Sequence, residues 1–485
     1  MSTTVGDRVG AALVVLTSAA ILVLEVIANR LVAPYVGLTL ETYTASIGVA
    51  LGAIAAGAAL GGRLADVVSP RVWLGPATAL GGGLLLLARP IVVLVGPEVG
   101  PGPFSTVLLV ALAVAPAVLV LGSVTPGVVR LRLRRLEETG QTVGRLSALG
   151  TLGALAGTFL TGFVLLSSLP VSRVLLVTGT VLVVVGLVLS VGSKASLPLL
   201  GVATVAASLL IVVQGPCDVE TRYYCARVDA DPLRPGGRTL VLDGLRHSYV
   251  DLDNPSYLEF SYTRRIGDVL ASRPTGPLRA LHIGGGGFTV PRHLAAVRPG
   301  SQSRVLEVDP GVVEVGRERL GLVTGPDLEV VVGDARTSLR AETSASYDVV
   351  VGDAFGGLAV PWHLTTRELV EDVRRVLDDD GLYVLNVIDR PPLRFARAEA
   401  ATLRAVFAEV VLLGTQELAD GEAGGNVVLL ASDAPIDRAR LQQLADARAV
   451  GDGVHETEAF AGRARVLADD DAPVDQLLTP YADRA

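Results

Sequence analysis

The sequence predicts a bundle of transmembrane helices followed by a small β-subdomain and a Rossmann-like α/β domain of the methyltransferase type. Half of the 485 residues are hydrophobic and only 19% are charged, which is too apolar for a soluble protein of this size. The excess is confined to long apolar runs before about residue 213, and ordinary globular composition follows. We expect four segments: a transmembrane domain (1–215), a β-rich subdomain (216–256), a Rossmann-like α/β domain (257–432) and a peripheral tail (433–485).

Seven apolar runs each approach the roughly 20 residues that a helix needs to cross a bilayer. They cover residues 9–32, 46–64, 73–95, 107–124, 146–166, 171–191 and 197–213. The first run lacks the charged head and cleavage site of a signal peptide, so we expect it to be retained as a helix. The lipid bilayer of the cell membrane is therefore the first expected partner.

The distribution of basic residues predicts the orientation of these helices. One loop contains Arg130, Arg132, Arg134, Arg135 and Arg145. Arg63 and Arg71 flank an earlier loop, and Lys194 lies in a third. With seven helices all three loops fall on one side, which the positive-inside tendency makes cytoplasmic. The soluble domain is then expected outside the cytoplasm.

The two cysteines, Cys217 and Cys225, follow the last apolar run. A disulfide between them requires an oxidising compartment, and two unrelated thiols fit the spacing as well. The spacing is not a metal or redox signature, and no nearby histidine completes a zinc set, so we expect no metal.

Small and polar residues inside the runs predict how the helices pack. Glycines four residues apart let helix backbones approach closely, and two such pairs occur: Gly57 with Gly61, and Gly153 with Gly157. Packing within one bundle is the expected result. Glu25 and Asn29 share a helix face beside Arg30, which predicts a structural ion pair near the membrane interface. A transport or substrate-entry role is the alternative.

The soluble part begins with alternating apolar and polar residues around Asp243 and Gly244, the pattern of a β-hairpin in a small sheet over residues 218–253. A helix is expected over 257–270. Short β-rich runs then alternate with helical patterns, at 278–283, 304–308, 328–332, 348–351 and 382–388. This alternation predicts a doubly wound, mostly parallel sheet, with late edge strands at 410–413 and 427–430.

Ligands bind such a sheet outside the carboxyl ends of its strands. The first strand ends in Gly284, Gly285, Gly286 and Gly287, and the next three end in Glu307, Asp334 and Asp353. Glu307 lies roughly 20 residues beyond the glycines, where an acid can accept hydrogen bonds from both ribose hydroxyls. Asp334 is placed to accept from an adenine amino group. The alternatives are a solvated strand end for Glu307 and a turn residue for Asp334.

Two classes of ligand are disfavoured. The single lysine, Lys194, lies outside the soluble part, so there is no phosphate-binding GxxxxGK[ST] motif and no lysine for a Schiff base. The net charge of -8, without a basic patch outside the membrane loops, argues against nucleic acid. The expected ligand is a nucleoside without phosphates.

The order and spacing of GGGG, LEVDP, VVGDA, VVVGDAF and WHLTTRELVEDVRRVLDDDGLYVLN resemble the spermidine synthase family, the polyamine aminopropyltransferases. The segment LDGLRHSYVDLDNPSYLEFSY is similar to that family's β-subdomain and first helix. The resemblance covers residues 217–430, and the fusion to helices resembles a membrane-embedded branch. It implies no tightly bound cofactor, a donor that is decarboxylated S-adenosylmethionine or S-adenosylmethionine, the product methylthioadenosine, an amine or polyamine acceptor, and a homodimer as the expected assembly.

The resemblance also implies roles for individual residues. Glu307 matches the ribose acid, and Asp334 with Ala335 matches the adenine contact. Asp353 matches the catalytic acid that takes a proton from the attacking amine, and Tyr262 matches the tyrosine that orients it. His247, where the family has glutamine, and the four glycines complete the expected donor site.

The sequence departs from the family at the residues that grip amines. Gly287 and Gly356 stand where the family has aspartates, and Thr263 stands where it has histidine. Two lost charge-assisted hydrogen bonds are worth about 1.5 to 3 kcal/mol each. Three functions therefore stay open: a membrane-anchored aminopropyltransferase, an S-adenosylmethionine-dependent methyltransferase, and a non-catalytic nucleoside- or polyamine-binding domain that regulates the membrane bundle.

His363 is expected just before a helix on which Thr365 and Glu368 form a capping box. Its functional alternative is a place in the lining of the ligand cleft.

Overall fold

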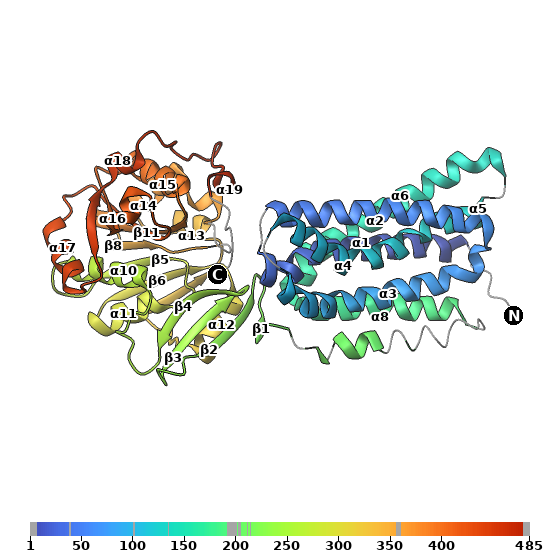
Figure 1. The fold of residues 1–485 in the computed structure, drawn as a ribbon, viewed down its shortest axis with the longest axis horizontal. Helices are drawn as coiled ribbons and strands as arrows, with labels where there is room; N and C mark the ends of the chain where they lie inside the picture. Colours follow the sequence, from blue (N-terminus) through green and yellow to red (C-terminus); the bar gives the residue numbers. More distant parts are fainter. Residues whose placement is uncertain are drawn as a thin grey trace. The chain divides into compact units, whose positions relative to one another are not determined.

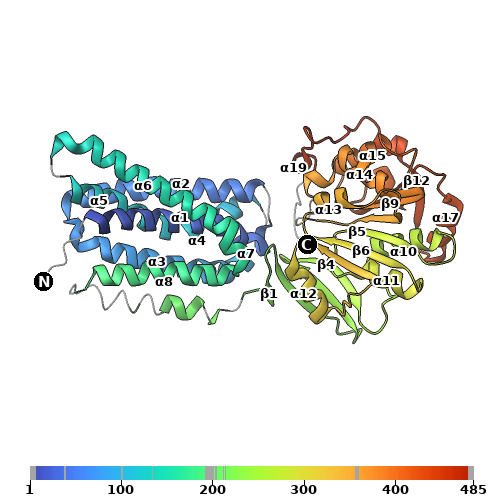
Figure 2. The ribbon, with the colours of Figure 1, turned by 180° about the vertical axis from the view of Figure 1, so that it is seen from behind.

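The computed structural model describes residues 7–37, 40–99, 102–133, 135–191, 201, 205–210, 212–213, 215–355 and 360–478. The chain divides into two compact units, Met1–Tyr224 and Cys225–Ala485 (Figures 1 and 2). The division lies a few residues beyond the predicted boundary at residue 215. The described part of the first unit contains helices followed by strand β1 (Val219–Glu220), and the second unit contains the large sheet.

Long apolar helices lie alongside one another in the first unit (Figures 1 and 2). The α-helices described in this unit are α1 (Asp7–Val36), α2 (Leu40–Val67), α3 (Pro70–Val95), α4 (Pro103–Gly122), the short α5 (Val124–Arg132), α6 (Thr139–Phe159), the short α7 (Leu166–Ser168) and α8 (Val171–Leu189), with a π-helical segment, Leu160–Leu165, joining α6 to α7. Among the described residues, six helices are long and apolar enough to cross a membrane. They match the first six predicted runs, whereas the seventh, 197–213, lies partly outside the described residues.

Glycines bring α6 against α1. A Cβ atom added to Gly153 would lie 2.4 Å from the carbonyl oxygen of Val15, and one added to Gly157 would lie 2.5 Å from that of Ala19. Gly57 meets the backbone of α4 in the same way. The packing of helices within one bundle, predicted from the glycine spacing, is confirmed.

The ion pair predicted between Glu25 and Arg30 is wrong. Arg30 donates to the carbonyl oxygen of Thr221 at 2.7 Å, and Glu25 forms no ion pair with any residue that the structure describes. Five helical residues rotate two side chains about 140° apart, so Glu25 and Arg30 leave α1 on different faces. Asn29 instead accepts a hydrogen bond from the hydroxyl of Ser46 on α2, at 2.8 Å.

Ser190, at the end of α8, and Val213 both contact α3. A Cβ atom on Gly75, near the start of α3, would lie 2.5 Å from Oγ of Ser190. Arg89, near the end of α3, donates from Nη1 to the carbonyl oxygen of Val213 at 2.8 Å. Ser190 and Val213 therefore lie toward opposite ends of α3.

The second unit begins with an antiparallel meander of β2 (Cys225–Ala230), β3 (Gly237–Leu242) and β4 (Leu245–Asp251). Asp243 and Gly244 join β3 to β4 with φ values of 48° and 81°. Two successive left-handed residues form the turn that suits a tight hairpin, and an Asp-Gly pair favours it. The predicted hairpin is confirmed.

The main sheet has the strand order β12-β10-β11-β9-β8-β5-β6-β7. Its strands are β5 (Arg279–Ile283), β6 (Gln302–Glu307), β7 (Leu328–Val332), β8 (Tyr347–Gly352), β9 (Leu377–Asp389), β10 (Glu409–Thr415), β11 (Gly425–Ser432) and β12 (Asp452–Glu456). Strands β5 to β9 are parallel, and the last three are antiparallel. The doubly wound sheet matches the prediction. However, β11 lies between β9 and β10, and β10 lies between β11 and β12, so the edge position predicted for both strands is wrong.

Helices cover both faces of this sheet (Figures 1 and 2). In β8, Val349 and Val351 pack in the cluster that holds α10 (Ser261–Ser272) and α11 (Thr289–Val297). Val350 points to the opposite cluster, which holds α13 (Ala335–Ala341), α14 (Arg367–Val376) and α15 (Arg394–Arg404). The alternation follows from the period of two in a β-strand. The remaining helices are α12 (Pro310–Arg319), α16 (Gln416–Asp420), α17 (Arg438–Ala447), α18 (Thr457–Ala461) and α19 (Val474–Leu477).

The segment after residue 433 is part of the domain and not the peripheral tail that composition predicted. Strand β12 pairs with β10 at the edge of the main sheet. Phe460, Leu467 and Val474 are buried in the core. These apolar residues are widely spaced among charged ones, so they produce no clear helical or strand periodicity.

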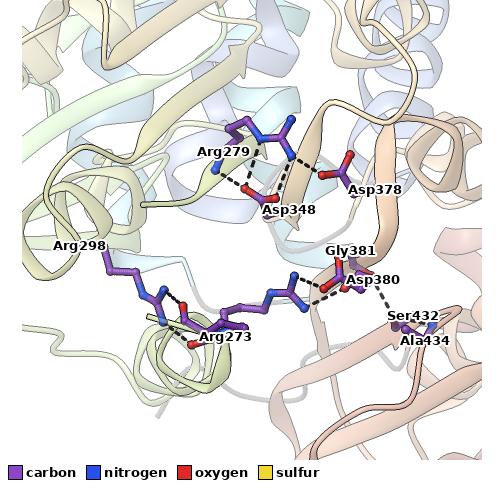
Figure 3. A network of polar contacts seen from close by, with 10 residues as sticks. Arg273, Arg279, Arg298, Asp348, Asp378, Asp380, Gly381, Ser432 and Ala434 are labelled. Atoms are coloured by element: carbon purple, nitrogen blue, oxygen red, sulfur yellow. Dashed lines mark hydrogen bonds and ion pairs between the residues drawn. The ribbon is translucent and has the colours of Figure 1, made fainter. Parts of the chain in front are cut away.

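Arginine–carboxylate pairs connect the amino ends of β5, β8 and β9 (Figure 3). Arg279 contacts Asp348 at 2.9 Å and also Asp378, while Arg273 contacts Asp380 at 2.9 Å. These pairs are at least partly exposed, so each contributes roughly 0 to 1 kcal/mol. The candidate site lies at the opposite, carboxyl ends of the strands.

The glycine contact between α6 and α1 predicts opposite effects for two equivalent substitutions. Gly144→Ala, in α6 with nothing within 4 Å of the new Cβ, should stabilise the helix by up to about 1 kcal/mol. Gly153→Ala should lower the melting temperature of the detergent-solubilised chain, because its Cβ would overlap the backbone of Val15. Equal melting temperatures for the two variants would contradict this packing.

Candidate functional site

The first two glycines of the loop after β5 bring two strand-end acids together. Gly284 has a φ of 97°, and a Cβ there would lie 2.6 Å from the carbonyl oxygen of Asp353. A Cβ on Gly285 would lie 3.1 Å from Oε2 of Glu307. Only glycine allows the backbone to approach both acids this closely. The structure therefore unites three positions that are far apart in the sequence.

The other two glycines meet the hairpin strand β4. A Cβ on Gly286, whose φ is 49°, would lie 2.7 Å from Oγ of Ser248 and 3.1 Å from Nδ1 of His247. A Cβ on Gly287 would lie 2.7 Å from Cβ of Ser248, whose hydroxyl accepts a hydrogen bond from the Gly287 N–H at 2.9 Å. Burial lowers the pKa of His247 to about 4, so its ring is neutral at pH 7. An acid at position 287 would have to displace Ser248.

Glu307 is a buried carboxylate that accepts hydrogen bonds from the backbone on two sides. Its Oε2 accepts from Gly285 N at 2.8 Å and from Gly286 N at 3.4 Å, and its Oε1 accepts from Asp309 N at 2.9 Å. Burial raises the pKa of Glu307, and these backbone N–H groups oppose the shift. A carboxylate has about four acceptor positions, so at least one is left for a ribose hydroxyl. The solvated strand end is excluded, because Glu307 is only 6% exposed.

Asp334 follows β7 and caps helix α13. One carboxylate oxygen accepts from Thr337 N at 2.9 Å, and the other contacts Nε2 of His363 at 3.0 Å. Burial raises the pKa of Asp334, but hydrogen bonds from Thr337 and His363 outweigh it, so the pKa lies below its usual value. Ala335, the first helical residue, is buried. One oxygen of Asp334 therefore has the local structural role that the turn-residue alternative gave it, and the other contacts His363.

The capping box predicted near His363 is wrong. The hydroxyl of Thr365 donates to the carbonyl oxygen of Trp362 at 2.7 Å, and Glu368 accepts from Asp469 N at 3.1 Å. Both side chains are therefore used by contacts that the local sequence does not reveal. Helix α14 begins at Arg367 instead.

Asp353 follows β8 and is held by two side chains. Nδ2 of Asn386 donates to its Oδ1 at 2.7 Å, and the hydroxyl of Tyr262 on α10 forms a second hydrogen bond. Burial raises the pKa of Asp353 to about 7, although both hydrogen bonds act to lower it. A carboxylate with a pKa near neutrality suits proton transfer at physiological pH.

Two asparagines of this site are not among the residues that the sequence predicted. Asn386 accepts a hydrogen bond from Nδ2 of Asn426 on the neighbouring strand β11, at 3.1 Å. Each interrupts or begins an otherwise apolar strand segment, LYVLNVI and NVVLLA. A polar residue inside a buried strand was the signal available, since buried polar groups require partners.

The described part of the site therefore contains Asp353, Tyr262, Glu307 and His247 around the glycine loop. Asp334 lies at the end of the next strand, where Gly333 N donates to the carbonyl oxygen of Glu307 at 2.9 Å. Gly356, the second position at which the family has an aspartate, lies outside the described residues.

A glycine loop and acids at consecutive carboxyl ends of a parallel sheet are the arrangement of a Rossmann-like domain. Residues 259–398 match the family described as spermine/spermidine synthase domain. This part of the chain belongs to the spermidine synthase family.

Curated relatives support the same assignment. The polyamine aminopropyltransferase of Vibrio vulnificus is 32% identical over 192 residues, which cover 39% of this chain and 62% of that protein. Polyamine aminopropyltransferase 2 of Streptomyces coelicolor is 32% identical over 327 residues, covering 62% of this chain and 58% of that protein. The chain thus spans about 60% of the length of these relatives. The second match is longer than the whole second unit, so the similarity extends into the helical unit.

Among solved structures, a probable spermidine synthase from Corynebacterium glutamicum is 29% identical, with a TM-score of 0.49. The match covers 54% of this chain and 98% of that chain.

Asp353 predicts a specific dependence of stability on pH. Unfolding returns it to the ordinary aspartate pKa of about 4, whereas its folded pKa is about 7. Between these values the unfolded chain has released the proton that the folded chain keeps, so stability falls as pH rises, by up to about 1.4 kcal/mol per pH unit. Asp353→Asn removes this contribution.

The measurement is thermal unfolding of the detergent-solubilised full chain, wild type against Asp353→Asn, across that pH window. The advantage of the variant should grow with pH. Parallel curves for the two proteins would show that Asp353 has an ordinary pKa.

Proposed function

We propose that the chain is a membrane-anchored, spermidine synthase-like aminopropyltransferase, with decarboxylated S-adenosylmethionine or a related adenosyl sulfonium as donor and an amine as acceptor. The observation that carries the proposal is the carboxyl group of Asp353, whose pKa is raised to about 7. Tyr262 and Asn386 hold this group beside the glycine loop. The family match over residues 259–398 includes this strand end.

The proposed chemistry uses Asp353 as the base. An aliphatic amine is protonated at neutral pH and cannot attack until a proton is removed. Asp353 takes that proton, the nitrogen lone pair forms a bond to the carbon next to the sulfonium, and the electrons of the breaking C–S bond go to sulfur. The leaving group is a neutral thioether, methylthioadenosine. In this scheme Glu307 holds the ribose and Asp334 the adenine amino group, which fixes the sulfonium in line for attack.

The contact between Gly287 and Ser248 favours a second candidate, methyl transfer from S-adenosylmethionine. Ser248 fills the space beside the loop, and no acid at position 287 is present to bind the amino end of an aminopropyl group. The nucleoside residues Glu307 and Asp334 would serve either donor. The two candidates therefore share the nucleoside site and differ at the tail of the donor.

Membrane anchoring and orientation are part of the proposal. Six apolar helices, together with the positions of Ser190 and Val213 toward opposite ends of α3, support seven crossings. Seven crossings put the arginine-rich loops and the second unit on opposite sides of the membrane. Cys217 and Cys225 are both disulfide-bonded, which favours an oxidising compartment for the start of the second unit.

Calorimetry on the purified full chain tests the nucleoside site. S-adenosylmethionine, its decarboxylated form and methylthioadenosine are titrated, and turnover is then measured with putrescine and spermidine. Asp353→Asn should lower turnover by about 10²- to 10⁴-fold while nucleoside affinity is retained, because the side chain acts on the proton and not on the nucleoside.

The outcomes separate the candidates. If the chain methylates an acceptor with S-adenosylmethionine, the second candidate, methyl transfer, is correct and aminopropyl transfer is not. Binding without turnover by either donor would leave a non-catalytic nucleoside-binding domain. The absence of any nucleoside binding would exclude both enzymes.

Labelling of cysteines in intact cells tests the orientation. A membrane-impermeant maleimide should label Cys217 and Cys225 only after a reductant has opened the disulfide. An Arg135→Cys variant, in the arginine-rich loop, should be labelled only after the cells are permeabilised. Free thiols at 217 and 225 that are protected in intact cells would reverse the orientation.

A further inference from the structure

The contact between Asp334 and His363 gives the nucleoside site a residue that the family resemblance does not supply. Nε2 of His363 lies 3.0 Å from one oxygen of Asp334, while the other oxygen accepts from Thr337 N at 2.9 Å. A carboxylate is only an acceptor here, so His363 donates from Nε2. The plane of the Asp334 carboxylate is fixed from both sides.

We propose that His363 is a positioning residue that holds Asp334 in the orientation that selects an adenine base. The inference rests on the proposed function, since it takes Asp334 as the base contact of a nucleoside site. Each oxygen of Asp334 has one of its two lone pairs occupied, by Thr337 or by His363. The unused lone pairs have fixed directions, toward which a ligand donor must point.

The short segment that carries His363 is itself held to the helix that Asp334 caps. Arg336, on the first turn of α13, donates from Nη1 to the carbonyl oxygen of His363 at 3.1 Å. The guanidinium of Arg336 also forms a two-pronged pair with Asp469, with both distances 2.6 Å. The hydroxyl of Thr366 donates to the same Asp469 carboxylate at 2.8 Å.

These contacts give Asp469, near the C-terminal end of the chain, a role in positioning His363. Two-pronged arginine–carboxylate pairs are among the stronger polar contacts and fix geometry as well as distance. Arg336 is only 8% exposed, whereas the side chain of Asp469 is 44% exposed. Asp469 therefore holds His363 in place through Arg336, although it is more than 100 residues away in the sequence.

The selectivity follows from the hydrogen-bonding groups of the base. Adenine presents an amino group that donates to a carboxylate. Hypoxanthine presents a carbonyl oxygen at the same position, and that oxygen repels a carboxylate held in place. A carboxylate that is free to rotate would avoid part of the repulsion from hypoxanthine and lose part of the attraction to adenine. By fixing the carboxylate, His363 increases the difference in affinity between the two bases.

The test compares two substitutions in the full chain. His363→Gln keeps an N–H donor close to the position of Nε2, whereas His363→Leu removes the donor and retains comparable volume. Each protein is titrated by calorimetry with methylthioadenosine and with methylthioinosine. His363→Leu should bind methylthioadenosine roughly tenfold more weakly and lose about as much selectivity over methylthioinosine, as expected for one lost hydrogen bond to a charged group. His363→Gln should restore both.

A thermal melt of each variant checks that α13 and α14 are intact. If the wild type binds methylthioadenosine selectively and His363→Leu does so equally well, His363 has no positioning role. Tighter binding by His363→Leu would show that His363 blocks the base, which also overturns the inference. If the wild type binds neither nucleoside, the proposed function fails and this inference fails with it.

Discussion

The buried carboxylate of Glu307 holds the site together, because it accepts backbone hydrogen bonds from the loop after β5 and from the turn after β6. Without such partners a buried charge would cost several kcal/mol. The same bonds align two consecutive strand ends, so the glycine loop is held against Glu307 on one side and Asp353 on the other. Every other contact of the site is positioned relative to this loop.

Local environment gives the three strand-end acids different properties. Glu307 is buried, which raises its pKa, and the backbone N–H groups that it accepts from oppose this shift. Asp334 is exposed and hydrogen-bonded, and its pKa lies below the usual value. Asp353 has two donors, but desolvation outweighs their effect, so its pKa rises to about 7. In the function that we propose, Glu307 and Asp334 bind the nucleoside and Asp353 transfers the proton.

Much of the sheet is predictable from the sequence, because buried parallel strands leave a run of apolar residues and the acids at their ends interrupt it. Glu307, Asp334 and Asp353 each stand out as an acid that directly follows such a run. Strand β12 does not stand out, since its sequence DGVHE alternates only weakly and its burial depends on pairing with β10. The order of β9, β10 and β11 in the sheet also cannot be predicted from the local sequence pattern, because nothing in a strand's own residues specifies its neighbour.

The contacts that tune the site come from distant segments, and local sequence does not encode them. Ser248 meets Gly287 only because the hairpin lies over the glycine loop. Asn386 and Asn426 meet across two strands that are 40 residues apart. Thr365 and Glu368 have the spacing of a capping box, yet Trp362 and Asp469 engage them instead. In each case tertiary contacts override a local preference.

A structure of the full chain with methylthioadenosine bound tests the central claim most directly. The account predicts the ribose hydroxyls against Glu307, the adenine amino group against Asp334, and the thioether sulfur turned toward Asp353 and Tyr262. A nucleoside bound away from the carboxyl ends of β5, β6 and β8, or bound there with its base and sulfur exchanged, would contradict it.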